Sequence, residues 1–498
     1  MQSIVRTRTV RAVARWVGLA ALLFFWCSAR VPAAAEREFR AGAATSNITP
    51  PLSLDSPIAG DWGRPPGTYI HDELFVRCLV LDDGSTRVGI AVVDNLAIPR
   101  YVLDPAKQAV HERTGLAPER ILIACTHTHS AAPARGRDRF AVEQPLDGYQ
   151  RFLADRIADA FQNAVERLEA AEIGFGSASL PDEVFHRRWL MKPETPLPNP
   201  FGGTDQVRMN PGVGNPNLLE PAGPTDPEIA FLVVRATEGR PIALLANYSL
   251  HYVGGVPGGH ISADYFGCFA EEVARLLEAE RESPPFVAMM SNGTSGNINN
   301  IDYRGGQKRY PPYGRMRRVA DRAAAAVYGA YPKVEYQPWV PLGMVERDLP
   351  LATRRPSPEL LERAREIVAN PEDYPRAGLP SPQAVVAYAE RTLRMHEQPA
   401  EIPVLLQALR IGELAITAIP FEVFVQTGLE LKEKSPFPRT FTISLANSTY
   451  GYLPTVRDHE LGGYETWLGT SRMEVEAEPK IVAALLEMLE RLEEAGDR

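Results

Sequence analysis

The sequence predicts an α/β protein with a mixed β-sheet core flanked by helices, built as one large domain. Short apolar runs alternate with amphipathic segments of helical period along most of the 498 residues, and this is the pattern of buried strands covered by helices. Five apolar runs end in polar sequence that contains His, Glu, Ser or Asn. Such endings are typical of α/β proteins, whose sites form at the carboxyl ends of strands.

In the first half of the chain, strand and helix patterns follow one another. A turn of sequence Asp-Asp-Gly at 82–84 joins the first two apolar runs into a strand pair. Phe152, Ile157 and Phe161 recur at helical spacing in a long amphipathic segment. The predicted strands here are 74–81, 88–93, 121–125, 229–234 and 242–248, and the predicted helices are 102–114, 146–171 and 265–278.

The second half continues the alternation around two less regular stretches. Residues 190–227 are rich in Pro, Gly and Asn and are interpreted as a long surface loop. Residues 356–398 resemble an inserted pair of charged helices, and neither stretch divides the domain. The predicted strands are 286–290, 404–410, 414–419 and 441–445, and the predicted helices are 314–331, 422–434 and 479–494.

The N-terminus has the pattern of a secretory signal peptide over residues 1–35. Several arginines precede an apolar stretch at 16–26, and Pro-Ala-Ala-Ala at 32–35 offers a small-residue cleavage site. The apolar stretch is short for a membrane span, although an uncleaved anchor is the alternative. We therefore expect a secreted or periplasmic protein whose mature chain is 36–498.

The charge and the cysteine content exclude two classes of protein. The net charge is −9 with no basic stripe, so nucleic acid is not an expected partner. The cysteines of the mature chain, Cys78, Cys125 and Cys268, are too few and too odd in number for a disulfide framework. They are interpreted as small core residues.

Two histidines follow the apolar strand 121–125 in the segment 126–130, Thr-His-Thr-His-Ser. In an extended chain, residues i and i+2 face the same way, so His127 and His129 are expected to point together into the space at the end of the strand. Paired imidazoles of this kind are a natural start for a zinc site. Candidate partners stand at the other strand ends, at His251, in the Gly-rich turn 291–297 and at Glu422.

These endings resemble, in content and order, the motifs of the neutral ceramidases. The resemblance rests on the segments 126–130 and 291–299, on His251, on Pro-Phe-Glu at 420–422 and on Gly-Tyr-Glu at 463–465. The opening 42–50, Gly-Ala-Ala-Thr-Ser-Asn-Ile-Thr-Pro, is also similar. The resemblance covers most of the mature chain, which would lack the β-rich C-terminal domain of the long ceramidases.

The resemblance implies a zinc-dependent amidase of sphingolipid metabolism that splits the N-acyl bond of ceramide by attack of zinc-bound water. The implied zinc ligands are His127, His251, Glu422 and Tyr464. His129 would face the substrate carbonyl, and Arg187 would help to bind the oxyanion. A lipid substrate would also bring the protein into peripheral contact with a membrane surface. The oligomeric state is left open.

Several of these residues have structural interpretations as well. His251 alone would be an ordinary structural histidine, and Glu422 could favour the first turn of a helix, where a carboxylate meets the positive end of the dipole. Tyr464 competes with two nearby tyrosines, and Arg187 could be a solvated charge together with its neighbour. The two tyrosines are Tyr450 and Tyr452, and the neighbour of Arg187 is Arg188. Asp264 could be a helix N-cap at least as readily as a supporting partner of the site, and Asp94, at a strand end, could be a supporting partner or a structural residue.

One departure from the family bears on mechanism and substrate. Asn299 falls where the resemblance places an active-site serine, and Ser295 is the nearest hydroxyl. An asparagine can donate a hydrogen bond to an oxyanion but cannot act as a nucleophile, so Asn299 is a candidate catalytic donor. We therefore expect an exported zinc hydrolase of a ceramide-like amide. The alternatives are a zinc hydrolase of another amide or ester, and a non-catalytic binding protein on the same fold.

Overall fold

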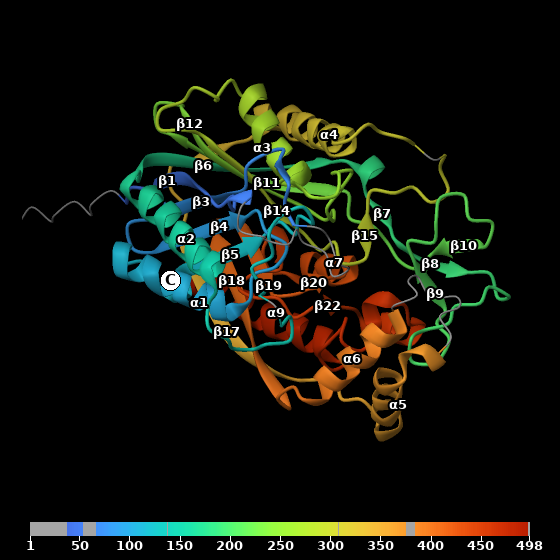
Figure 1. Ribbon diagram of the computed structural model, residues 1–498. Coiled ribbons are helices and arrows are strands. Elements are labelled where there is room, and N and C mark those ends of the chain that lie inside the picture. Colours follow the sequence, from blue (N-terminus) through green and yellow to red (C-terminus); the bar gives the residue numbers. More distant parts are fainter. Residues whose placement is uncertain (1–36, 53–65, 137, 307, 375–383, 497–498) are drawn as a thin grey trace, which may run out of the picture. The chain divides into compact units, whose positions relative to one another are not determined.

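Two β-sheets lie face to face at the centre of the fold, and helices cover their outer faces (Figure 1). The computed structural model describes residues 37–52, 66–136, 138–306, 308–374 and 384–496. The predicted signal peptide lies outside the described residues. Residues 38–498 form one compact unit, and the α/β class with a mixed sheet core is confirmed.

The larger sheet has nine strands in the order β14-β12-β11-β6-β1-β3-β4-β5, with β16 pairing β6 beside this path. Most neighbours are antiparallel, but β4 with β5 and β12 with β14 are parallel. The bounds are β1 Arg40–Asn47, β3 Phe75–Asp82, β4 Arg87–Val93, β5 Ile121–Cys125, β6 Glu169–Ser179, β11 Glu228–Ala236, β12 Pro241–Tyr248, β14 Val287–Asn292 and β16 Tyr336–Gln337.

The smaller sheet has four strands in the order β17-β18-β19-β21. Its strands are β17 Leu342–Ala352, β18 Glu401–Ile411, β19 Leu414–Ile419 and β21 Arg439–Ser444. The last two are parallel. Backbone hydrogen bonds from Cys125 to Leu445 and from Asn447 to Ile123 tie the end of β21 to β5 of the larger sheet. The carboxyl ends of β5 and β21 therefore lie side by side.

The apolar runs are continuous because the strands are buried on both faces. In β5, Leu122 and Ala124 pack into the core between the sheets, whereas Ile121, Ile123 and Cys125 pack against helices. The helices α1 Arg100–Thr114 and α2 Gly148–Glu166 cover that end of the larger sheet.

The other helices complete the outer layers. Helices α3 Asp264–Leu276 and α4 Gly314–Ala330 lie together over β11, β12 and β14 (Figure 1). Helices α7 Val425–Lys434 and α9 Ala477–Gly496 cover the smaller sheet. The order of layers is thus helix, sheet, sheet, helix. Among the described residues, no helix combines the length and apolar character that a membrane crossing requires.

Three parts of the structure differ from the sequence-based expectation. The helix predicted over 146–171 ends at Glu166, and β6 begins at Glu169 because that segment pairs with β1 and β11. The interpretation of 190–227 as an irregular loop is wrong in part, since β8 Arg188–Met191, β9 Val207–Met209 and β10 Leu218–Pro221 form a three-stranded sheet. The helix predicted from 422 begins at Val425, after strand β20 Glu422–Val423.

Short strand pairs and helices occupy the ends of the main strands and the insertions. The pairs are β2 Tyr69–Ile70 with β13 His260–Ile261, β7 Phe185–His186 with β15 Ile298–Asn299, and β20 with β22 Tyr452–Leu453. The stretch 356–398 carries α5 Pro358–Ala369 and α6 Ala384–His396, and α8 Val456–Leu461 precedes the 3-10 turn η6 Tyr464–Thr466.

Candidate metal centre

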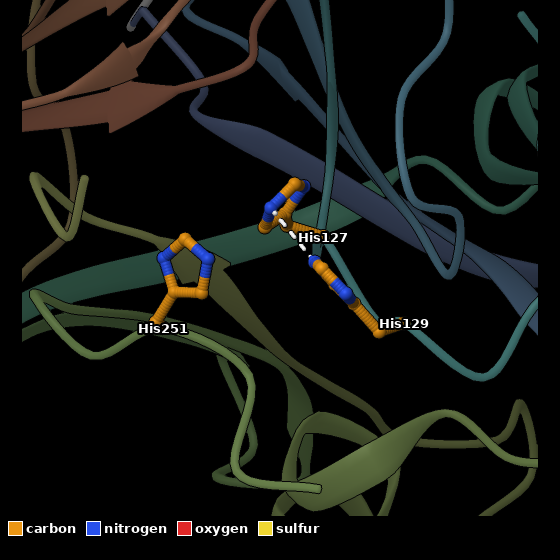
Figure 2. A group of neighbouring side chains, drawn as sticks. All are labelled: His127, His129 and His251. Atoms are coloured by element: carbon orange, nitrogen blue, oxygen red, sulfur yellow. Dashed lines mark hydrogen bonds between the residues drawn. The ribbon is translucent and has the colours of Figure 1, made fainter. Parts of the chain in front are cut away.

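Three imidazoles converge at the carboxyl ends of β5 and β12 (Figure 2). His127 and His129 follow β5, and His251 follows β12. One ring nitrogen of each lies within 4.8 Å of the others. The fold therefore brings together histidines that are more than 120 residues apart in the sequence.

Backbone carbonyls fix the tautomers of His127 and His251. The Nδ1 of His127 lies 2.7 Å from the carbonyl oxygen of Leu96, and the Nδ1 of His251 lies 3.1 Å from that of Ser295. A carbonyl oxygen only accepts hydrogen bonds, so each Nδ1 carries a hydrogen, and in the neutral ring each Nε2 keeps a lone pair. His127 itself has a left-handed backbone, with φ of 68°, held by a bond from its N–H to the Asn95 carbonyl.

Glu422 brings a third lone pair to the same point. Its Oε2 lies 3.3 Å from the Nε2 of His127 and 3.8 Å from the Nε2 of His251. This oxygen is buried and has no hydrogen-bond partner among the residues that the structure describes. Burial, reinforced by Arg187 and the other two imidazoles, holds the pKa of His251 well below its usual value, so that ring stays neutral.

Three buried acceptors that face one another repel unless a cation lies between them. Two imidazoles and one carboxylate, with the far nitrogen of each ring bonded to a carbonyl, are the donor set and outer support that zinc sites use. The residues present therefore fit a divalent metal ion. The interpretation of Glu422 as a helix-dipole carboxylate is wrong, because Glu422 lies in β20 and not in a helix.

Tyr452 lies beside Glu422 because the two are register partners in the parallel pair β20–β22. The Tyr452 hydroxyl is hydrogen-bonded to the Glu422 side chain. Burial opposes ionisation of Glu422, but His127 in its protonated form, this hydroxyl and Arg187 outweigh burial and keep the pKa of the carboxyl below its usual value. Burial also raises the pKa of Tyr452 well above the usual value.

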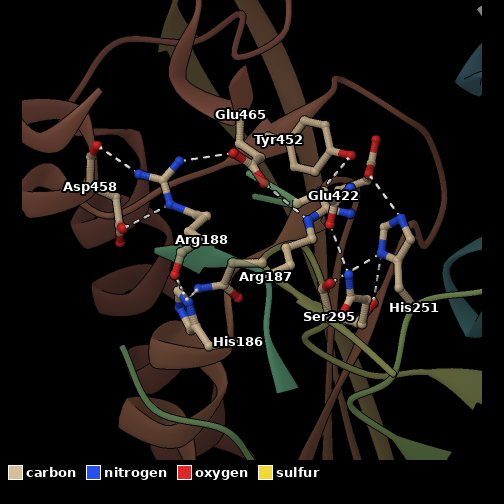
Figure 3. Close-up of polar contacts among 12 residues, drawn as sticks. His186, Arg187, Arg188, His251, Ser295, Glu422, Tyr452, Asp458 and Glu465 are labelled. Carbon is tan, nitrogen blue, oxygen red and sulfur yellow. Dashed lines mark hydrogen bonds and ion pairs between the residues drawn. The ribbon is translucent and has the colours of Figure 1, made fainter. Parts of the chain in front are cut away.

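Arg187 extends this arrangement into a buried network of charges (Figure 3). Its Nη2 donates to the Tyr452 hydroxyl over 3.0 Å, and its Nε donates to Oε1 of Glu465 over 3.0 Å. The second carboxylate oxygen of Glu465 accepts from Nη1 of Arg188 over 2.9 Å. Because both arginines and Glu465 are buried, the interpretation of the two arginines as solvated charges is wrong.

Solved structures of the same architecture exist among the ceramidases. The crystal structure of the neutral ceramidase from Pseudomonas aeruginosa matches 92% of this chain and 75% of its own length, with a TM-score of 0.67 and 17% sequence identity.

The fold is that of the neutral ceramidases. A structure described as ceramidase complexed with C2 matches 92% of this chain and 76% of its own, with a TM-score of 0.67 and 16% identity. No protein-family model and no curated protein sequence matches the chain. At such low identity the likeness establishes the fold alone.

On this ceramidase-like fold, the tyrosine next to the histidine and carboxylate group is Tyr452. The ring of Tyr464, the predicted ligand, packs edge-on against Tyr452 with centroids 5.9 Å apart, and against Trp467 at the same distance. The sequence placed both tyrosines near the site, but only the β20–β22 register shows which hydroxyl meets Glu422.

His129 lies on the side of the group that is partly open to solvent. Its side chain is half-buried, and its ring is stacked on Tyr252 with centroids 3.7 Å apart. Its Nε2 is 3.2 Å from the Nε2 of His127. When the His127 ring is neutral with its hydrogen on Nδ1, His129 is the donor of this pair.

Asn299 and Ser295 have different surroundings. The amide nitrogen of Asn299 donates to the side chains of Asn210 and Tyr303, and its amide oxygen accepts from the Ile301 N–H. Both amide hydrogens are thus engaged, so its role as an oxyanion donor stays a prediction. Ser295 supports His251 through its carbonyl and donates its hydroxyl to Asn292.

Asp264 supports the loop that follows His251. It is the first residue of α3 rather than its N-cap, which is Ala263. Its carboxylate accepts the backbone N–H groups of Val253 and Gly254. Burial raises its pKa to about 6.

Asp94 supports the end of β4 in a comparable way. It binds Nη1 of Arg77 at 2.5 Å and the backbone N–H of Phe75 at 2.9 Å through one oxygen. Since Phe75 and Arg77 both lie in β3, Asp94 ties the end of β4 to that strand.

Sequence reasoning did not single out Glu465 as a functional residue. The only available signal was an acidic residue between Tyr464 and Trp467 in the Gly-Tyr-Glu motif. Its importance depends on two arginines almost 280 residues earlier, which no local pattern reveals.

Proposed function

We propose that this protein is a zinc-dependent amidohydrolase that cleaves the N-acyl linkage of a ceramide-like lipid. The observation that carries the proposal is the convergence of three buried acceptor atoms, His127 Nε2, His251 Nε2 and Glu422 Oε2. The shared fold with the ceramidases supports the substrate class.

His127, His251 and Glu422 would hold the ion, and a tyrosine would complete the donor set. The sequence predicts Tyr464 for that place. The geometry favours Tyr452, whose hydroxyl is bonded to Glu422. A bound Zn²⁺ would supply Lewis acidity toward the scissile carbonyl and lower the pKa of a coordinated water.

Arg187 is suited to bind the charge that develops on the carbonyl oxygen. A guanidinium has five N–H donors. The Nε donor goes to Glu465 and one Nη2 donor goes to Tyr452, so donors remain for an oxyanion. Because the guanidinium is buried and tied at two points, it needs little reorganisation when charge develops.

His129 is suited to hold or move a proton at the reacting amide. Its ring is held by Tyr252 on one face, and its Nε2 points toward the metal ligands. A partly exposed imidazole next to the reacting centre can protonate the departing amine nitrogen. His129 and Arg187 therefore take the catalytic roles, and the other residues named above position them.

Metal analysis together with an amidase assay tests the proposal. Purified protein should contain about one zinc ion per chain and release fatty acid from N-dodecanoyl sphingosine in detergent micelles. His127→Ala should lose both the zinc and the activity. His111→Ala is the matched control, because His111 is exposed on α1. Stoichiometric zinc in His127→Ala would rule out this ligand set.

A related function, hydrolysis of another amide or of an ester, is favoured by Asn299, which stands where the resemblance places a serine and whose amide is already engaged. A panel of N-acyl sphingosines, N-acyl amino acids and acyl esters separates the two. Zinc-loaded protein that turns over the esters faster than the sphingosine amides would replace the ceramide-like substrate by an ester.

We also propose that the protein is exported, from the basic and apolar pattern of residues 1–35. N-terminal sequencing of the protein recovered from the expressing cells checks this. A mature chain that begins near residue 36 supports export, and an intact N-terminus contradicts cleavage.

A further inference from the structure

A cavity of about 610 Å³ lies between the strand pair β7–β15, the segment that follows β15, and the first turns of α4. Phe185, Asn300, Tyr310 and Arg315 are among the residues that line it. Its volume lies in the range of small-molecule sites. The candidate metal centre does not include any of these residues.

The acidic side chains in the cavity wall already have partners. Glu183 is bound by Arg318 over 2.6 Å and also by Arg322. Asp182 pairs with Arg322 over 3.0 Å. Asp302 accepts hydrogen bonds from the backbone N–H groups of Arg304 and Gly305 in its own loop, over 3.0 and 2.9 Å. These carboxylates are therefore committed to neighbours.

Arg315 is different, because no carboxylate forms an ion pair with it within the described part of the chain. Among the described residues, its guanidinium makes a single hydrogen bond, from Nη2 to the Asn300 carbonyl over 2.8 Å. The side chain is half-buried, and burial lowers the pKa of its guanidinium. Four of its five N–H donors are thus left in a cavity wall.

We propose that this cavity binds an oxyanion, such as a phosphate, a sulfate or a carboxylate group, with Arg315 as its main ligand. A planar guanidinium presents paired donors that match two oxygens of such a group, which gives both affinity and geometric selectivity. Lys308 in the same wall adds positive charge. A partly desolvated cation without a counter-ion is costly, and a bound anion removes that cost.

Arg315, in the wall of this cavity, also contacts the two segments that lead away from His251 and from Ser295. Arg315 bonds to Asn300, which belongs to the segment that continues from Ser295. The Cβ of Arg315 also lies 3.7 Å from the position of a Cβ built on Gly255, in the loop that follows His251. If the protein hydrolyses an N-acyl substrate as proposed above, the anion in this cavity is an acidic head group of that substrate.

Calorimetric titration with inorganic phosphate, in a chloride buffer, tests the anion site without any need for turnover. The wild type should bind saturably in the millimolar range or tighter, and Arg315→Gln should weaken binding at least tenfold. Arg315→Lys, which keeps the charge and loses the paired donors, should fall between them. Arg317→Gln is the matched control, since Arg317 is an exposed arginine of the same helix paired with Glu271.

Absence of saturable binding to the wild type, or equal affinity of Arg315→Gln, would overturn the proposal. The titration is repeated with His127→Ala, which lacks the metal centre. Retained binding there assigns the anion to the cavity. Loss of binding in His127→Ala together with full binding in Arg315→Gln assigns it to the metal centre and refutes the cavity site.

A second pair of probes separates the sources of the anion. N-dodecanoyl glycine carries a carboxylate, and its methyl ester does not. If the wild type binds the acid at least tenfold more tightly than the ester, and Arg315→Gln removes the difference, the anion is a substrate head group. If phosphate binds but the acid and the ester bind equally, the head-group inference is wrong and the site takes free anions. Both probes are titrated into metal-depleted wild type and metal-depleted Arg315→Gln, which should not hydrolyse them, so a failure of the amidase proposal is recognised separately.

Discussion

Glu422 and Tyr452 are partners in a parallel two-stranded ladder, and this register places a phenol hydroxyl on the carboxylate that faces His127 and His251. Residues paired in parallel register project from the same face of the ladder. The Tyr452 hydroxyl also accepts a hydrogen bond from Arg187. A single short strand pair thus connects the candidate metal ligands to the candidate oxyanion donor.

Tyr452→Phe should weaken zinc binding about tenfold or more, because it removes the hydroxyl that supports Glu422. Tyr464→Phe should leave the zinc affinity within about twofold. Competition with a chromophoric chelator measures both affinities. The opposite order would restore Tyr464 as the fourth donor predicted from the sequence.

Arg187→Ala should lower kcat by about 10²–10³, because a buried donor to the oxyanion is lost. Zinc content should stay near one ion per chain, since the guanidinium does not contact the three acceptor atoms. Arg187→Lys should recover only part of the rate. A variant without Arg187 that turns over N-dodecanoyl sphingosine at the wild-type rate would remove this residue from the mechanism.

Glu465→Gln should destabilise the fold by about 3 kcal/mol, because two buried arginines lose the charge that they share. Denaturant unfolding of the metal-loaded protein measures the change. Glu362→Gln, which breaks an exposed pair with Arg365, should cost less than about 1 kcal/mol. Equal effects of the two substitutions would show that the buried network contributes no more than a surface pair.

Asp264 should make the wild type less stable as the pH rises. Burial raises the folded-state pKa of this carboxyl to about 6, from 3.8 in a model compound. The folded state therefore holds the proton more tightly, and its contribution is present below about pH 4 and is lost as the pH rises through 6. The free energy of unfolding of the wild type, relative to Asp264→Asn, should fall by up to ~3 kcal/mol between pH 4 and pH 7. A difference that stays constant over this range would contradict the shift.

Removal of the metal should lower the thermal midpoint, and added Zn²⁺ should restore it. At a free concentration of about one hundred times the Kd, binding stabilises the folded state by about 2.7 kcal/mol. His251→Ala should show no such response, because two acceptor atoms cannot replace three. Differential scanning fluorimetry with and without Zn²⁺ gives both comparisons, and an equal response of His251→Ala would mean that the ion binds elsewhere.

The apolar runs predicted most of the central strands because a strand buried on two faces needs uninterrupted apolar sequence. The predicted strand 121–125 coincides with β5, and the predicted strand 441–445 overlaps β21. Strands β1 and β17 carry small or charged residues and do not have that pattern, so the sequence did not indicate them. Their pairing partners, which lie far along the chain, decide their conformation.

By itself, the sequence determined that His127, His129 and His251 stand at the ends of buried strands, since that follows from local composition and period. Only the tertiary structure decided that Tyr452 meets Glu422, that Glu465 holds Arg187 and Arg188, and that the Asn299 amide is engaged. Those relationships arise from strand register and from contacts across hundreds of residues. The physical reason is that the direction of a side chain at a strand end is set by the partner strand, and local sequence carries no record of that partner.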